Sequence, residues 1–246
     1  MKRLKVLRVC ATDMFAKTAL LPEIDHMISE GYSVDIAFPE DSVSSELIRQ
    51  GYNIILIKNT RHISIVSKHL DKKRISYIKI REPGGNLNSE KIRKLILSNK
   101  SDFNKNTDLL LYLAARSENI KTIKNSYKRK VILIDRFTDS TIAYQHYGMG
   151  VNLNLIKILN KFLLKNIKVN FTFLNLVNKK NLFSRLKKRK SLNRYDKFDM
   201  SFYNKVQKGF VKLSNIDKKK YQLINSNLNI KKNEQLVLKV IDRIIK

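Results

Sequence analysis

The sequence predicts an α/β fold in which a parallel sheet is flanked by helices. Apolar runs of strand length alternate with helical stretches of about ten residues, the pattern of parallel βαβ units. Residues 131–134 add a continuous apolar run, Val-Ile-Leu-Ile, which ends at Asp135 and Arg136. Such a run is typical of a strand buried on both faces in the middle of a parallel sheet.

We expect a βαβαβ unit in residues 1–65 and a second unit in residues 66–246. In the first unit, Gly31 and Gly51 stand in the position that commonly ends a helix. Its predicted strands are 5–10, 33–37 and 52–57, and its predicted helices are 20–30 and 42–50. The predicted strands of the second unit are 76–80, 131–135, 171–175 and 221–225. Its predicted helices are 66–72, 90–97, 108–126, 152–165, 202–213 and 234–245, with a basic helix ending near residue 190.

Composition indicates a cytoplasmic protein without a membrane partner. No segment approaches the ~18–20 uninterrupted apolar residues that span a bilayer. The apolar run at residues 6–10 is too short for the core of a signal peptide. The single cysteine, Cys10, excludes an internal disulfide framework and fits a reducing compartment.

The net charge of +29 is the most unusual feature of the composition. A charge of this size attracts phosphates and would bind nucleic acid non-specifically. The alternative is a coding bias toward Lys, Asn and Ile, which is favoured because the basic residues are spread along the chain. No helix-turn-helix or zinc pattern accompanies them, so we expect nucleic acid only as a non-specific partner.

The stretch that follows residue 131 is where we expect a ligand. In an open α/β sheet, ligands bind in the crevice beyond the carboxyl ends of the strands, which is where Asp135 and Arg136 fall. Ser140 offers an N-cap for a helix that would carry Tyr144 and Gln145 back over the same crevice.

This stretch resembles the Asp-Arg-Tyr/Phe…Ser-Thr-Ile-Ala-Tyr-Gln-Gly block of thymidylate kinases, with His146 where the family usually has glycine. Three more blocks follow the family's order: Arg-Glu-Pro-Gly-Gly at 81–85, Leu-Leu-Tyr-Leu-Ala-Ala-Arg at 110–116 and Asn-Arg-Tyr-Asp at 193–196. The resemblance covers about residues 67–246. It implies a P-loop-kinase-like fold and the ATP-dependent phosphorylation of dTMP to dTDP with Mg²⁺. Its partners would be dTMP and ATP, and a homodimer is a possible assembly.

The resemblance also assigns roles to residues. The spacing of Tyr112 and Arg116 alone favours a tyrosine in the core and an arginine on the surface. The resemblance implies a different role, because in the family such a ring stacks on thymine and the arginine four residues later bonds the base. Arg136 would hold the monophosphate, since a guanidinium matches phosphate oxygens in a bidentate manner. The implied dTMP-binding residues are Arg81, Tyr112, Arg116, Arg136, Ser140, Tyr144 and Gln145. The implied catalytic residues are Asp135, which would also hold Mg²⁺ through a water, Arg136, and Arg194 of the charge-neutralising lid.

The phosphate loop of such a kinase, Gly-x-x-x-x-Gly-Lys-Ser/Thr, is missing or degenerate before Arg81. The nearest stretch is residues 11–18, where Lys17 and Thr18 are the candidate ATP-binding residues. Both glycine positions hold alanine, and Met14 and Phe15 put bulky side chains where bare backbone must face phosphate.

Residues 1–65 resemble instead the Rossmann-like start of the amino-terminal domain of GT-B glycosyltransferases. Val-Cys-Ala-Thr-Asp at 9–13, Leu-Pro at 21–22 and Gly-Tyr-Ser-Val at 31–34 carry this resemblance. The chain therefore reads as a fusion of unlike parts. Two alternative functions stay open: a non-catalytic deoxynucleotide-binding remnant, and a glycosyltransferase-like fragment that uses a nucleotide sugar.

The missing loop also removes the strand that precedes it in the kinases. We expect strand 5–10 to fill the resulting gap beside strand 131–135, because unpaired buried backbone groups cost about 1–3 kcal/mol each. The competing arrangement is a separate amino-terminal sheet.

Overall fold

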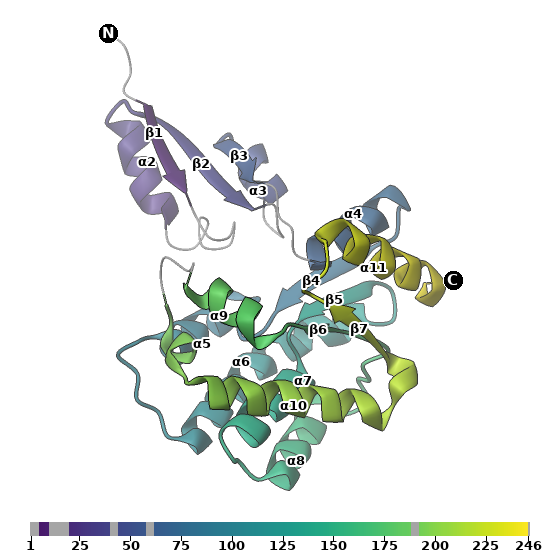
Figure 1. The fold of residues 1–246 in the computed structure, drawn as a ribbon. Coiled ribbons are helices and arrows are strands. Elements are labelled where there is room, and N and C mark those ends of the chain that lie inside the picture. Colours follow the sequence, from purple (N-terminus) through teal and green to yellow (C-terminus); the bar gives the residue numbers. More distant parts are fainter. Residues whose placement is uncertain (1–4, 10–19, 40–43, 58–61, 188–191, 246) are drawn as a thin grey trace. The chain divides into compact units, whose positions relative to one another are not determined.

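The computed structural model describes residues 5–9, 20–39, 44–57, 62–187 and 192–245. The chain divides into two compact units, Met1–Lys68 and His69–Lys246. The division falls within the residue range of helix α4 (His62–Lys72), which Figure 1 labels. No helix in the described ranges is both long and apolar enough to cross a membrane.

The first unit is a parallel βαβαβ arrangement. Its strands β1 (Lys5–Val9), β2 (Ser33–Pro39) and β3 (Asn53–Ile57) pair in the order β1-β2-β3. Its helices are α2 (Leu21–Ser29) and α3 (Ser44–Arg49). Ile24 of α2 and Leu47 of α3 pack with Val34 and Ile36 of β2, so both helices cover the same face of the sheet.

The second unit contains two parallel pairs of strands. Strand β4 (Tyr77–Arg81) pairs with β5 (Val131–Asp135), and β6 (Thr172–Leu176) pairs with β7 (Tyr221–Asn225). Strand β1 takes its ladder from β2, which follows it after a single crossover helix and so needs only local closure, and β5 takes its ladder from β4. The pairing of strand 5–10 with strand 131–135, across the two units, stays a prediction.

Helices surround these strand pairs, and side-chain caps set where several of them begin. They are α5 (Leu87–Leu97), α6 (Lys105–Ser126), α7 (Thr138–Thr141), α8 (Leu153–Leu164), α9 (Lys179–Lys187), α10 (Met200–Ile216) and α11 (Ile230–Ile244). The side chains of Asn86, Asn104 and Asn229 accept hydrogen bonds from backbone N–H groups of the first turns of α5, α6 and α11. These three helices therefore begin three or four residues before their predicted starts.

The segment after β5 differs from the prediction at Ser140. The helix begins at Thr138 rather than after Ser140, whose backbone N–H donates to the Phe137 carbonyl oxygen at 3.0 Å. Ser140 therefore lies inside α7 and is not its N-cap. The cause lies at Arg136, whose left-handed backbone (φ 65°) turns the chain directly after the strand.

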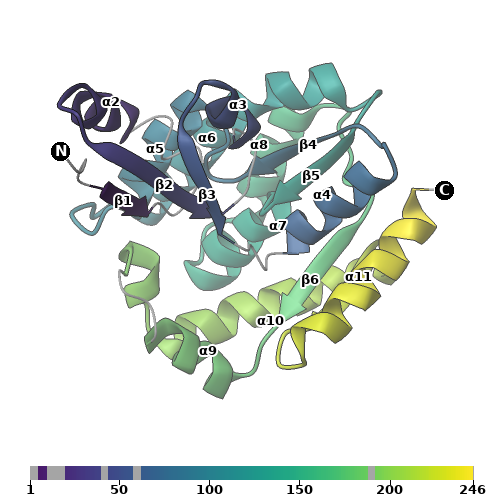
Figure 2. The same cartoon turned by 90° about the horizontal axis from the view of Figure 1, so that it is seen from above.

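Helix α7 continues into a π-helix, η2 (Ile142–Gly148), that carries Tyr144 and Gln145. This π-helix packs against α10 at two glycines (Figures 1 and 2). A Cβ atom on Gly148 would lie 2.6 Å from Cε2 of Phe202, and one on Gly209 would lie 2.7 Å from Cγ of Tyr147. Close approach of the two backbones therefore positions the π-helix.

Replacing Gly209 with alanine should destabilise the protein. Overpacking costs about 1–3 kcal/mol, which exceeds the gain of about 0.8–1.0 kcal/mol from exchanging a helical glycine for alanine. We expect a net loss on the order of 1 kcal/mol in urea unfolding followed by circular dichroism. The control is Lys208→Ala at the neighbouring exposed position, expected within about 0.5 kcal/mol of wild type. A Gly209→Ala variant as stable as this control would contradict the packing described here.

Candidate active site

The carboxyl ends of β4 and β5 bring the first charged residues together. Arg81 and Asp135 are register partners in the parallel ladder, and the Glu82 N–H donates to the Asp135 carbonyl oxygen at 2.9 Å. The Arg81 guanidinium donates to Glu90 of α5 at 2.7 Å. Arg81, Asp135 and Arg136 thus lie together at the carboxyl ends of the two strands, where a ligand crevice is expected.

Arg136 is exposed and is held by its backbone and by an aromatic ring. Its φ of 65° is uncommon for a residue with a side chain. Its guanidinium carbon lies 5.1 Å from the centroid of the Tyr144 ring, within the range of a cation–π contact. The Tyr144 ring therefore helps to hold the guanidinium at the carboxyl end of β5.

Sequence reasoning missed a third arginine, Arg93 of α5. Its guanidinium donates to the Pro83 carbonyl oxygen at 2.6 Å. Burial and the neighbouring Arg81 charge lower the pKa of Arg93 to about 10, and the Arg136 charge acts in the same direction. The signal was available: Arg93 stands one helical turn after Glu90, on the face that turns back toward Arg81. Mutual repulsion among these guanidiniums would be relieved by a bound anion.

Beside the arginines lie the rings of Tyr112, Tyr144 and Tyr195, which we call the tyrosine wall. The Tyr195 ring meets Tyr112 edge-on at 6.0 Å and Tyr144 at 5.9 Å between centroids. Burial raises the pKa of Tyr112 to about 12, so its ring is neutral at pH 7. The predicted residues Tyr112, Arg136 and Tyr144 are therefore brought together, because the Arg136 charge acts on both Tyr112 and Tyr144.

Behind this wall, Asp108 forms a second cluster that sequence reasoning also missed. Its carboxylate is almost fully buried and accepts hydrogen bonds from the Tyr195 hydroxyl and the Arg194 guanidinium. The Gln145 amide nitrogen lies 3.4 Å from both Asp108 Oδ2 and the Tyr195 hydroxyl, and Gln145 Oε1 has no partner among the described residues. Arg194 is thus anchored to the first turn of α6. The signal for Asp108 was its position four residues before Tyr112, which puts both side chains on one face of the helix.

Arg116 is buried, and side chains of the protein itself occupy its guanidinium. Its side chain is 2% exposed, and each of its three nitrogens is engaged. Nε donates to Glu82 Oε2 at 2.8 Å, Nη1 to Asn160 Oδ1 at 2.6 Å and Nη2 to Thr141 Oγ1 at 2.9 Å. Bonding of a base by Arg116 stays a prediction, and the geometry shows a guanidinium that joins four elements of the fold.

Glu82 is the acidic partner in this buried ion pair. Burial raises the pKa of Glu82, and the Arg116 charge opposes that rise. Glu82 Oε1 is buried without a partner among the described residues. A buried pair of this kind gains little over apolar packing, but breaking it leaves an uncompensated charge.

The other predicted site residues have the following places. Ser140 is half-buried inside α7, and Asp135 is half-buried at the end of β5. Lys17 and Thr18 lie outside the described residues. No group of three or more His, Cys, Asp or Glu side chains suited to a metal occurs in the described ranges.

A parallel α/β unit with cations at the carboxyl ends of its strands has the architecture of the P-loop-kinase-like class. The family model for thymidylate kinase matches residues 59–237. The chain belongs to the thymidylate kinase family.

Relatives of known sequence and structure agree with this placement. The thymidylate kinase of Thermosipho africanus is 36% identical over 156 residues, covering 63% of this chain and 77% of its own. That of Kosmotoga olearia is 28% identical over 179 residues, covering 72% and 86%. The crystal structure of thymidylate kinase from Ehrlichia chaffeensis matches with a TM-score of 0.58 at 26% identity, covering 85% of this chain and 98% of that one.

The Arg116–Glu82 pair predicts a strong energetic coupling. Arg116→Met or Glu82→Leu alone should each cost about 3–5 kcal/mol, because each leaves a buried charge without its partner. The double variant should cost much less than the sum of the two, as a double-mutant cycle by urea unfolding would show. Arg243→Met, at an exposed position of α11, is the control. Single effects below about 1 kcal/mol that simply add would contradict the pairing.

Proposed function

We propose that the His69–Lys246 unit binds dTMP at the carboxyl ends of β4 and β5. Arg81, Arg93 and Arg136 would hold the monophosphate, and Tyr112 would stack on thymine. The observation that carries this proposal is the convergence of guanidiniums on one place beside the tyrosine wall. Burial and the neighbouring Arg81 charge lower the pKa of Arg93, and a phosphate at this place would neutralise the like charges.

The remaining acceptor residues would shape the sugar and base side of this site. Tyr144, already against Arg136, would close over the deoxyribose together with Ser140 of α7. The unpartnered Gln145 Oε1 supports a role in accepting a hydrogen bond from the base. Arg116 would act mainly as a positioning residue, because its nitrogens are occupied by Glu82, Thr141 and Asn160.

The family reaction is the transfer of a phosphoryl group from ATP to dTMP, and we propose that this chain performs it slowly. No Gly-Lys dipeptide occurs anywhere in the sequence, so the glycine loop that cradles phosphates has no counterpart. Losing one preorganised donor typically costs on the order of 10²–10³ in rate. Lys17 and Thr18 are the nearest candidates for an ATP contact, and Arg194 would need to leave Asp108 to neutralise charge during transfer.

Magnesium fits the acceptor side through Asp135. Mg²⁺ is usually held by one or two carboxylates together with substrate phosphates and waters. Asp135 supplies one carboxylate beside Arg136, and would hold the ion through a water. When bound, the ion would neutralise charge on the phosphates.

The comparisons do not favour the two alternatives, a non-catalytic remnant and a glycosyltransferase-like fragment. The resemblance of residues 1–65 to glycosyltransferases stays a prediction, as do the joint at residues 65/66, the homodimer and the cytoplasmic location.

Binding of dTMP should depend on Arg136. Removing a charge-assisted bidentate contact costs about 1.5–3 kcal/mol, so Arg136→Ala should weaken dTMP binding about 10–100-fold in isothermal titration calorimetry. The matched control is Arg243→Ala, which removes the same charge from exposed α11 and should leave the dissociation constant unchanged. Equal affinities in the two variants would remove Arg136 from the phosphate site.

The rate of dTDP formation should be reduced far more than the affinity for dTMP. We expect dTMP to bind measurably while dTDP forms near the background rate in a coupled assay with ATP and Mg²⁺, because several donors are missing together. The comparison is an active thymidylate kinase under the same conditions. Turnover equal to that enzyme, and abolished by Lys17→Ala, would show instead that residues 11–18 form a working phosphate loop.

A further inference from the structure

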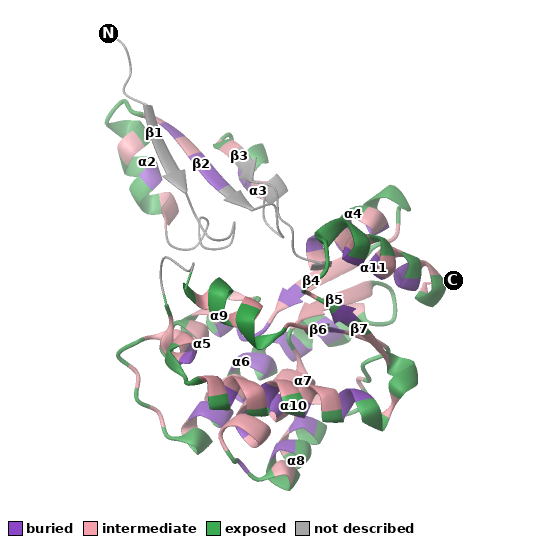
Figure 3. Ribbon diagram, in the orientation of Figure 1, coloured by how far each residue is buried: buried purple, intermediate pink, exposed green. Residues whose placement is uncertain are grey.

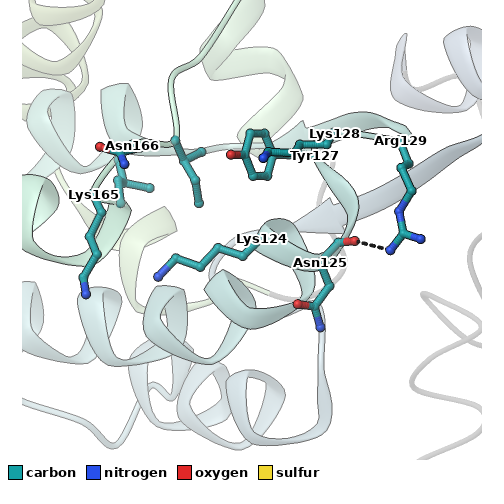
Figure 4. A pocket seen from close by; sticks show the side chains of 9 residues that line it. Lys124, Asn125, Tyr127, Lys128, Arg129, Lys165 and Asn166 are labelled. Carbon is teal, nitrogen blue, oxygen red and sulfur yellow. Dashed lines mark hydrogen bonds between the residues drawn. The ribbon is translucent and has the colours of Figure 1, made fainter.

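A strongly basic cavity lies at the carboxyl ends of α6 and α8, apart from the acceptor site. Its volume is about 500 Å³, and Figure 4 shows the side chains around it. Four of its lining residues are cations, Lys124, Lys128, Arg129 and Lys165, and none is acidic. In Figure 4 the side chains of Lys124 and Lys165 extend to the same side of the cavity.

These cations have no acidic partners within the described ranges. The Arg129 guanidinium donates to the Asn125 carbonyl oxygen at 3.3 Å, which leaves its charge unpaired. Residues 119–134 and 140–195 contain no Asp or Glu at all. All residues that line the cavity come from these two stretches, so no acidic neighbour in sequence neutralises their positive charge.

The negative ends of the two helix dipoles balance only a part of this positive charge. Cations are common near helix carboxyl ends, where each macrodipole places roughly half a negative charge. Two helices meet here, so about one of the four positive charges is compensated. The carbonyls of Ile123 and Lys161 also already accept hydrogen bonds from the backbone N–H groups of Tyr127 and Lys165, both at 2.9 Å.

Lys165 contributes a second, independent observation. Its φ of 51° places a residue with a long side chain in the left-handed region that favours glycine. Such outliers persist where the surrounding structure requires them, and they gather at ligand sites. This conformation ends α8 and places Lys165 on the wall of the cavity.

We propose that this cavity binds a small anion carrying two or more phosphate groups. Its volume falls within the range of about 300–1,000 Å³ typical of small-molecule sites. Tyr127 and Ile167 supply apolar wall between the cations, which suits a compact ligand. The site is separate from the acceptor site: Lys124 follows Arg116 by eight residues, about 12 Å along α6.

The test uses inorganic tripolyphosphate as the probe, measured by calorimetry with the full chain at roughly 0.15 M ionic strength, where the Debye length is about 8 Å. The variant Lys124→Gln/Lys165→Gln removes two cations from the cavity. Each charge about 4 Å from an anion is worth roughly a factor of five in water, so binding should weaken roughly 25-fold. The matched control is Lys121→Gln/Lys157→Gln, which lowers the net charge equally on exposed positions of the same helices outside the cavity. It should change binding less than about twofold, since screening weakens distant charges.

Repeating the measurement in the Arg136→Ala variant distinguishes binding in this cavity from binding by the arginines of the acceptor site. In Arg136→Ala, the cavity should still bind tripolyphosphate, and the Lys124/Lys165 effect should persist. Failure of dTMP binding would therefore leave this proposal standing, and failure of this test would leave the acceptor site standing. The proposal is overturned if wild type does not bind tripolyphosphate, if both lysine pairs weaken binding equally, or if only single-stranded DNA depends on Lys124 and Lys165.

Discussion

The buried guanidinium of Arg116 is the constraint on which the acceptor side of this molecule depends. It joins the turn after β4 through Glu82, helix α7 through Thr141 and helix α8 through Asn160. A charge this deeply buried is tolerated only when its donors are satisfied, because an unpaired buried charge costs several kcal/mol. The geometry of these four elements is therefore specified together rather than one by one. Figure 3 shows the mostly half-buried strands and the buried faces of the helices around them.

One face of helix α6 carries Arg116 and two further residues that hold other parts of the unit. Asp108, Tyr112 and Arg116 follow one another at intervals of four residues and so lie on the same side of the helix. Asp108 holds Tyr195 and Arg194, Tyr112 meets the Tyr195 ring, and Arg116 binds Glu82. One long helix thereby connects the anchored segment around Arg194 with the turn after β4. Burial raises the pKa of Tyr195, so its hydroxyl stays a donor to Asp108 at neutral pH.

Like charges gather at the carboxyl ends of β4 and β5. The Arg93 pKa is lowered by burial and by Arg81, and Arg136 keeps a left-handed backbone while it leans on Tyr144. Both arrangements cost free energy in the empty protein, and an anion at this place would offset that cost.

Short-range patterns in the sequence determined the elements and the order of the motifs. The strands at 131–135 and 221–225 have their predicted bounds, because charged or turn residues border each apolar run. Helix starts were less accurate, since Asn86, Asn104 and Asn229 extend their helices beyond the apolar periodicity. Only the tertiary structure decided that Arg116 faces Glu82 and that Arg93 joins the other arginines. Periodicity and caps act over one or two turns, whereas the direction of a charged side chain depends on partners far away in sequence, such as Asn160 for Arg116.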